Sequence, residues 1–179
     1  LMERIEDTGV FELFIPGLAA GCGYMYEIKR QGKGTTRKLD PVSRQISSVP
    51  ITASVVSDEN MPDSYAWNDG LWMIKRKKEA GKKKPVTVYE VSLTDWLKEK
   101  SADELVDFVK QEGYTHVCFL PVAEYLNEEM NGYSTLGYFA VTHRTGGSDA
   151  FKKLVDDCHN AGIGVIIDWN GAYFGTEVK

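Results

Sequence analysis

The chain has 179 residues, enough for one large domain or two small ones. Hydrophobic residues make up 42% and charged residues 26%, values typical of a globular protein, which exclude extended disorder as a description of the whole chain. The net charge of −5 argues against a general binder of nucleic acid or of anionic membranes.

The cysteines and the apolar runs indicate the cellular compartment of the protein. Cys22, Cys118 and Cys158 lie far apart and form no CxxC pair, so neither a disulfide framework nor a zinc knuckle is expected. No run approaches the roughly 18 apolar residues of a membrane span, and the first residues lack the apolar core of a signal peptide. We therefore predict a cytoplasmic protein that needs no metal and no cofactor.

The first part of the chain consists of short extended runs separated by turns. The runs are Val10–Ile15, Tyr24–Lys29, Lys38–Pro41 and Ile51–Val56. Their spacing is typical of antiparallel strands in a sandwich. An immunoglobulin-like sandwich needs about seven strands, so we expect the missing strands to precede Leu1. Residues 1–60 are thus predicted to be the C-terminal part of a β-sandwich.

Residues 61–84 are predicted to form a linker. Met61-Pro62-Asp63 breaks regular structure, and Leu71–Ala80 could form a short helix. The basic stretch Lys75–Lys84 is expected to be a solvated connector rather than a patch for a polyanion. We expect Trp67 and Trp72 to pack between the two parts of the chain rather than stack on a ligand.

After residue 85, three strands alternate with two helices. The strands are Val86–Val91, Thr115–Leu120 and Ile163–Ile167, and the second is a near-continuous apolar run typical of a sheet buried on both faces. Successive βα units of this kind build parallel sheets with right-handed crossovers. Residues 85–179 are therefore predicted to be α/β.

Cap signals set the bounds of the two helices. Ser101 and Glu104 form a capping box at the start of the first helix, and Gly113 stops it. Ser148 is expected to cap the second helix, and Gly162 ends it.

The pattern leaves open a doubly wound sheet or a closed eight-stranded barrel. Neither GxGxxG nor GxxxxGK[ST] follows any strand, so nucleotide binding lacks its phosphate cradle. A closed barrel takes about 250 residues, and this region would supply only three of its eight strands.

In either architecture, function lies beyond the carboxyl ends of the strands. The segments there are Ser92–Trp96, the loop Pro121–Gly147 and Asp168–Phe174. The loop is long for a βα connection, which suggests function. It is rich in tyrosine, glycine and asparagine, and aromatic rings beside hydrogen-bonding groups suit a sugar.

These segments resemble glycogen (1,4-α-glucan) branching enzymes, which are glycoside hydrolases of family 13, the α-amylase superfamily. The similarity to the first three βα units of their barrel lies in Tyr89–Trp96, Thr115–Val122 with Glu124, Gly132–Arg144 and Leu154–Trp169. The similarity to their glucan-binding module, of the CBM48 type, lies in Phe11–Gly17, Lys38–Pro41 and Thr52–Val56. The resemblance implies a partial (β/α)8 barrel preceded by a partial immunoglobulin-like sandwich.

The resemblance also implies roles for particular residues. Asp168 matches the first conserved acidic position of the superfamily, which orders the substrate pocket, and Tyr133 matches a tyrosine that stacks on the sugar. Tyr173, Arg144 and Glu124 complete the substrate-binding set that we expect. On the residues alone, Asp168 as a turn cap, Tyr133 and Tyr173 as packing residues, and Arg144 as a structural ion-pair residue remain open.

The resemblance implies an α-glucan ligand: glycogen, amylose or maltooligosaccharides. In the family, the nucleophile and the general acid lie on later strands, beyond Lys179, so no catalytic residue is expected within this chain and the chain alone should be inactive. The open edge of a three-stranded sheet would also permit self-association.

Ser92, Tyr125 and Tyr173 stand where branching enzymes usually carry histidine, and Asn131 stands where a tryptophan usually precedes Gly132. An inactive α-glucan-binding homologue is therefore the alternative to a branching enzyme, and a plain interaction module is a third hypothesis.

Overall fold

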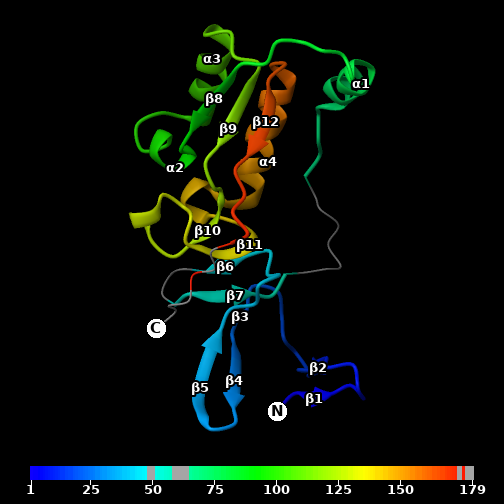
Figure 1. The fold of residues 1–179 in the computed structure, drawn as a ribbon, viewed down its shortest axis with the longest axis vertical. Helices are drawn as coiled ribbons and strands as arrows, with labels where there is room; N and C mark the ends of the chain where they lie inside the picture. Colours follow the sequence, from blue (N-terminus) through cyan, green and yellow to red (C-terminus); the bar gives the residue numbers. More distant parts are fainter. Residues whose placement is uncertain (48–50, 58–64, 173–174, 176–179) are drawn as a thin grey trace.

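The computed structural model describes residues 1–47, 51–57, 65–172 and 175 (Figure 1). The N-terminal part of the chain forms small antiparallel sheets at one end of the molecule, and the parallel sheet with its helices lies at the other end. Within the described residues, no helix combines the length and the apolar character needed to cross a membrane.

The N-terminal strands pair antiparallel, as predicted. They are β1 (Glu3–Arg4), β2 (Phe11–Glu12), β3 (Gly23–Tyr24), β4 (Tyr26–Arg30), β5 (Lys33–Lys38), β6 (Ile46–Ser47) and β7 (Ala53–Val55). β1 pairs with β2, β4 forms a hairpin with β5, and β7 lies between β3 and β6.

Several of these strands differ in extent from the prediction. The strand predicted over Val10–Ile15 shrinks to β2, because only two residues of β1 are there to pair with it. Leu39 and Asp40 are buried but follow the end of β5 instead of forming a strand of their own.

The second part contains a parallel three-stranded sheet. Its elements are α1 (Gly70–Glu79), β8 (Val88–Val91), α2 (Leu93–Trp96), α3 (Ala102–Gln111), β9 (His116–Phe119), β10 (Ala123–Tyr125), η1 (Glu128–Met130), β11 (Thr135–Val141), η2 (His143–Thr145), α4 (Gly147–Asn160) and β12 (Gly164–Ile167). β9 lies between β8 and β12, and both pairs are parallel. The prediction of three parallel strands is confirmed.

One face of the parallel sheet is covered and the other is open. Val91, Val117 and Phe119 pack with Leu105 of α3 and Leu154 of α4 in the main core. Side chains alternate between the faces of a strand, so the next residues along each strand point away from these helices. On that open face, Val88 is 43% exposed and Ile166 is 40% exposed.

The helix caps follow the sequence signals at one helix and not at the other. The Ser101 hydroxyl accepts a hydrogen bond from the amide of Glu104, and the Glu104 carboxylate accepts one from the amide of Ser101, so the capping box is confirmed. The expected cap at Ser148 is wrong: α4 begins at Gly147, and Gly146 occupies the cap position without a side-chain bond. Gly146 has φ +88°, a conformation that suits glycine, so the chain turns into the helix two residues earlier than predicted.

The long loop after β9 contains a hairpin, β10–β11, that was not predicted from the sequence. Its register shifts on both sides of Glu124, so the pairing is irregular. The hairpin carries Leu136 and Ala140 into a second core with Leu39 and Ile46 of the N-terminal part. A side chain at Gly137 would collide with the side chain of Ile46, so glycine permits this close packing.

The segment before α1 is fixed to α4. Asp156 of α4 is 3% exposed, and its carboxylate accepts hydrogen bonds from the backbone amide of Asn68 at 3.0 Å and from the Tyr65 hydroxyl at 3.2 Å. The ring of Trp72 stacks on the ring of His159, with centroids 3.7 Å apart. Trp72 is therefore a packing residue, as the sequence favours, but its partner is α4.

Candidate functional site

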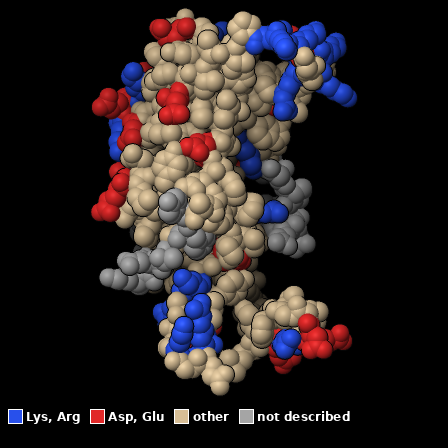
Figure 2. Space-filling model, viewed as in Figure 1, with Lys and Arg blue, Asp and Glu red and all other residues tan. Residues whose placement is uncertain are grey.

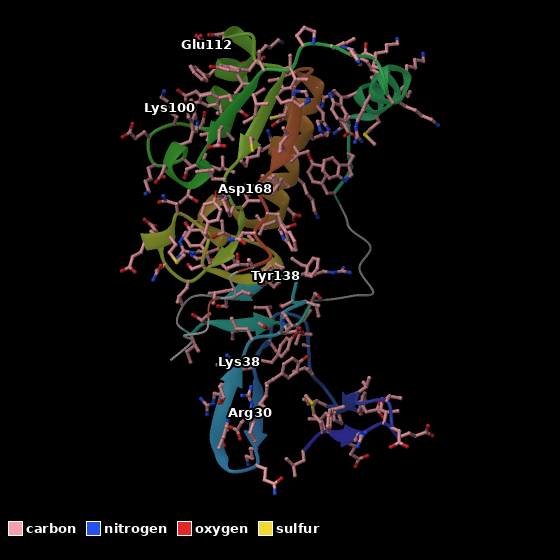
Figure 3. The ribbon with its side chains drawn as sticks, viewed as in Figure 1. Arg30, Lys38, Lys100, Glu112, Tyr138 and Asp168 are labelled. Atoms are coloured by element: carbon pink, nitrogen blue, oxygen red, sulfur yellow. The ribbon has the colours of Figure 1, made fainter. Side chains whose placement is uncertain are left out.

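Asp168 lies at the carboxyl edge of the parallel sheet, as the sequence predicts. Its backbone amide donates to the carbonyl of Phe119 at 2.9 Å and so continues the ladder between β12 and β9. Asp168 comes two residues after Ile166, so its side chain belongs to the open face of the sheet. Figure 3 shows it in the middle of the molecule, between the sheet and the β10–β11 hairpin.

Tyr133 is the direct partner of Asp168. Its hydroxyl donates a hydrogen bond to Oδ2 of Asp168. This hydrogen bond, followed by desolvation, raises the pKa of Tyr133 to about 12. The phenol therefore remains a neutral donor and fixes one carboxylate oxygen, leaving the other oxygen for a further partner.

A tight turn positions Tyr133. Asn131 and Gly132 both have positive φ, at 48° and 88°. A Cβ at Gly132 would lie 2.9 Å from the carbonyl oxygen of Pro121, so glycine is required where the hairpin passes the end of β9.

Glu90 and Cys118 share the open face with Asp168. They are direct neighbours across β8 and β9, and Cys118 in turn lies beside Ile166. Burial raises the pKa of the Cys118 thiol, and the negative charges of Glu90 and Asp168 raise it further. Glu90 is not among the residues predicted for the site, although a charged residue in an otherwise apolar run is a signal for it.

Aromatic side chains border the segment that follows Asp168. The Tyr138 hydroxyl donates to the carbonyl of Gly171 at 3.3 Å, and the rings of Tyr138 and Trp169 lie 5.6 Å apart. A hollow of about 150 Å³ opens here, and Asp168 and Asn170 contribute to its wall. Trp169 is 58% exposed, so an aromatic surface lies beside polar groups, as sugar binding requires.

Glu124 and Arg144 are brought together in a polar cluster around the buried Glu124 carboxylate. Glu124 is 1% exposed, and the Arg144 side chain is 21% exposed. Arg144 Nη1 donates to Glu124 Oε1 at 2.7 Å, and the backbone amide and Nδ1 of His143 lie 2.9 Å from Oε2. Both oxygens of Glu124 are thus occupied by protein donors, an arrangement that serves to hold the loop.

Ser92, Tyr125 and Tyr173 are the three positions where branching enzymes usually carry histidine, and the two that the structure describes have different environments. Ser92 caps α2 by accepting from the amide of Asp95 at 3.3 Å. Tyr125 is buried, with the guanidinium of Arg144 4.2 Å from its ring centre. Ser92 and Tyr125 both line a small hollow of about 70 Å³. Tyr173 lies outside the described residues.

Comparison with known proteins gives a consistent answer. No family model matches the chain. The chain is 42% identical over 180 aligned positions to a 1,4-alpha-glucan branching enzyme of Methylococcus capsulatus, which covers 95% of this chain and 24% of that protein. The branching enzyme of Nitrosococcus oceani is 41% identical over 95% of this chain and 24% of its own length. That of Gloeobacter violaceus is 40% identical over 98% of this chain and 25% of its own length.

A solved structure supports the fold. The crystal structure of a candidate alpha amylase from Salmonella typhimurium matches with a TM-score of 0.70 and 24% identity, over 99% of this chain and 29% of that one. The chain spans about a quarter of the length of the curated relatives that it matches. The resemblance read from the motifs is confirmed: over nearly its whole length, this chain is similar to a segment that makes up about a quarter of the length of 1,4-alpha-glucan branching enzymes.

Proposed function

We propose that this chain is part of a 1,4-α-glucan branching enzyme that cleaves an α-1,4 glucan and transfers the released segment to a 6-hydroxyl. The similarity to curated branching enzymes over 95% of the chain carries this proposal. In this assignment, β8, β9 and β12 are the first three strands of a (β/α)8 barrel. Residues 1–60 end a CBM48-like module, residues 61–84 are the linker, and the protein acts in the cytoplasm.

The pocket at Asp168 would hold one sugar of the chain. Asp168, with one oxygen fixed by Tyr133, would accept a hydrogen bond from a sugar hydroxyl. Trp169 offers an exposed aromatic face to the C–H side of a sugar ring. Tyr173 belongs to the proposed set through its place in the motif.

Glu124 and Arg144 would act on the sugar through the loop that carries Tyr133. Glu124 has no free oxygen to offer, so direct contact with a sugar fits it poorly. We assign this pair a positioning role in the proposed site.

The proposal leaves the bond cleavage itself to other residues. Retaining glycosidases need a carboxylate nucleophile and a carboxylic acid on the two sides of the bond, about 5 Å apart. The family resemblance places both on later strands of the barrel. Asp168 would bind and orient the sugar, and this chain alone should bind without turnover.

A chimera tests the activity. This chain would replace the corresponding quarter of the Methylococcus capsulatus enzyme, to which it is 42% identical. We expect the chimera to form α-1,6 branches on amylose, and Asp168→Asn to abolish most of that activity. Thr94→Ser, a small change in α2 that keeps the hydroxyl, serves as the control. A folded chimera that binds maltoheptaose but forms no branches would contradict the proposal.

The replaced histidines favour a second candidate function, an inactive homologue that only binds α-glucan. Hydroxyl and phenol groups at Ser92 and Tyr125 cannot supply an imidazolium charge. If this alternative holds, Ser92→His, Tyr125→His and Tyr173→His together should restore branching to an inactive chimera. Ordinary turnover by the unmodified chimera would exclude it.

A further inference from the structure

A third hollow lies at the opposite end of the parallel sheet from Asp168. It has a volume of about 400 Å³ and is bordered by α1, by the segment that follows α1, and by the amino-terminal ends of β9 and β12. His116 and Gly164, the first residues of these strands, lie in its wall. Because Asp168 follows the last residue of β12, this hollow and the one beside Asp168 are separated by the length of the sheet.

The wall of this hollow is strongly basic. Lys75, Arg76, Lys82 and Lys84 contribute to it, and of the described residues that line it only Glu79 carries a negative charge. Lys84 pairs with Glu79 at 2.7 Å. In the part of the chain that the structure describes, no ion pair involves the other three cations. Figure 2 shows the gathering of basic side chains over α1.

Three of the basic side chains act on Glu79. The hydrogen bond from Lys84 is the largest cause that lowers the pKa of Glu79, and the charges of Lys75 and Lys82 lower it further. The wall of the hollow carries three more positive than negative charges, and these positive charges repel one another. An anion bound between them would offset this repulsion.

The helix that carries two of these cations is fixed rather than loosely attached. Trp72 stacks on His159, and His159 Nδ1 lies 2.7 Å from the carboxylate of Asp69, directly before α1. The guanidinium of Arg76 lies 5.6 Å from the centre of the Trp72 ring. Lys75 and Arg76 are therefore held at the rim of the hollow. The basic side chains of Lys75–Lys84 are exposed to solvent, as the sequence predicts, but the helix that carries the first of them is attached to α4 through Trp72.

We propose that this hollow binds a phosphate monoester of a sugar. The excess of lysine and arginine donors suits a dianionic phosphate. The volume lies at the lower end of the range for small-molecule pockets, so it accommodates a sugar as well as the phosphate. The phosphate monoester could belong to a free hexose phosphate or to a phosphorylated glucan chain.

The test is titration calorimetry on the 179-residue chain with glucose 6-phosphate, with a maltooligosaccharide that carries a 6-phosphate, and with glucose. We expect saturable binding of at least one phosphorylated probe and none of glucose at the same millimolar concentrations. The tighter of the two phosphorylated probes identifies the source. If neither phosphorylated probe saturates, the proposal is overturned.

Two double variants separate the hollow from general charge. Lys75→Gln with Arg76→Gln removes two cations that line the hollow, and we expect the dissociation constant to rise roughly tenfold or more. Lys77→Gln with Lys78→Gln removes the same charge from the same helix but outside the hollow, so the constant should change by less than about twofold. Equal weakening in both variants would overturn the proposal.

Chemical footprinting on the unmodified chain provides an independent readout. Bound glucose 6-phosphate should slow the acetylation of Lys82 and Lys84 and leave that of Lys77 and Lys78 unchanged. Acetylation rates that do not respond at Lys82 and Lys84 would contradict the assignment, whatever the variants do.

Discussion

Replacement of Glu124 by glutamine tests the polar cluster that holds the loop. Every group near the two carboxylate oxygens is a donor: the Thr142 hydroxyl, the His143 amide and ring, the Arg144 guanidinium and the Tyr125 amide. Glutamine keeps the size of the side chain but turns one acceptor into an NH₂ group. Whichever way the amide is oriented, this NH₂ group faces donors.

The loss of stability in Glu124→Gln depends on how well other groups still stabilise the positive charge of Arg144. Removing one partner of a buried ion pair costs about 3–5 kcal/mol. Arg144 keeps some compensation, because it is 21% exposed, lies 4.0 Å from Glu128 and packs over the ring of Tyr125. We therefore expect Glu124→Gln to lower the free energy of unfolding by about 2–3 kcal/mol.

Urea denaturation of the 179-residue chain measures this change. The matched control is Glu27→Gln, because Glu27 is half exposed and lies 3.7 Å from Lys29 and 3.9 Å from Arg37. That exposed cluster should contribute less than about 0.5 kcal/mol. The reasoning fails if Glu124→Gln costs no more than Glu27→Gln.

Three further predictions concern the capping box, the segment before α1 that is fixed to α4, and the Asp168 site. Ser101→Ala should lower the free energy of unfolding by about 1 kcal/mol in the same assay, whereas Ser101→Thr, which keeps the hydroxyl, should stay close to the parent. Asp156→Ala should lower it by about 2 kcal/mol and release the segment before α1, seen as faster proteolysis there; unchanged cleavage would refute the anchoring role. Because the pKa of Tyr133 is raised to about 12, its contribution to stability is complete below the ordinary value near 10 and is lost as pH rises toward 12. The phenolate absorbance titration, taken as the difference from Tyr133→Phe, should show this midpoint, and Asp168→Asn should lower it; an unshifted midpoint would contradict the hydrogen bond.

The parallel sheet could be predicted from sequence because its signals are local. Apolar runs mark β9 and β12, the Ser101 and Glu104 pair marks the start of α3, and both helices are followed by glycines with positive φ, Gly113 and Gly162. Each signal depends on residues within a few positions of one another. The carboxyl edge, and with it the place of Asp168, follows directly from these elements.

The parts that the sequence missed depend on contacts between distant residues. The β10–β11 hairpin has an irregular register and packs on Ile46, far away in the chain, so no local period reveals it. The donors that occupy both carboxylate oxygens of Glu124 belong to residues 18–20 positions later in the chain. The place of Glu90 beside Cys118 requires the register of β8 and β9, which the sequence does not contain.

Titration of the isotope-labelled chain with maltoheptaose, followed by amide and indole resonances, tests most directly whether the Asp168 edge is a sugar site. We expect the first resonances to shift to be the Trp169 indole and the amides of residues 167–172, and Asp168→Asn to weaken binding. Saturable shifts confined to residues 1–57, or no shifts at all, would contradict it.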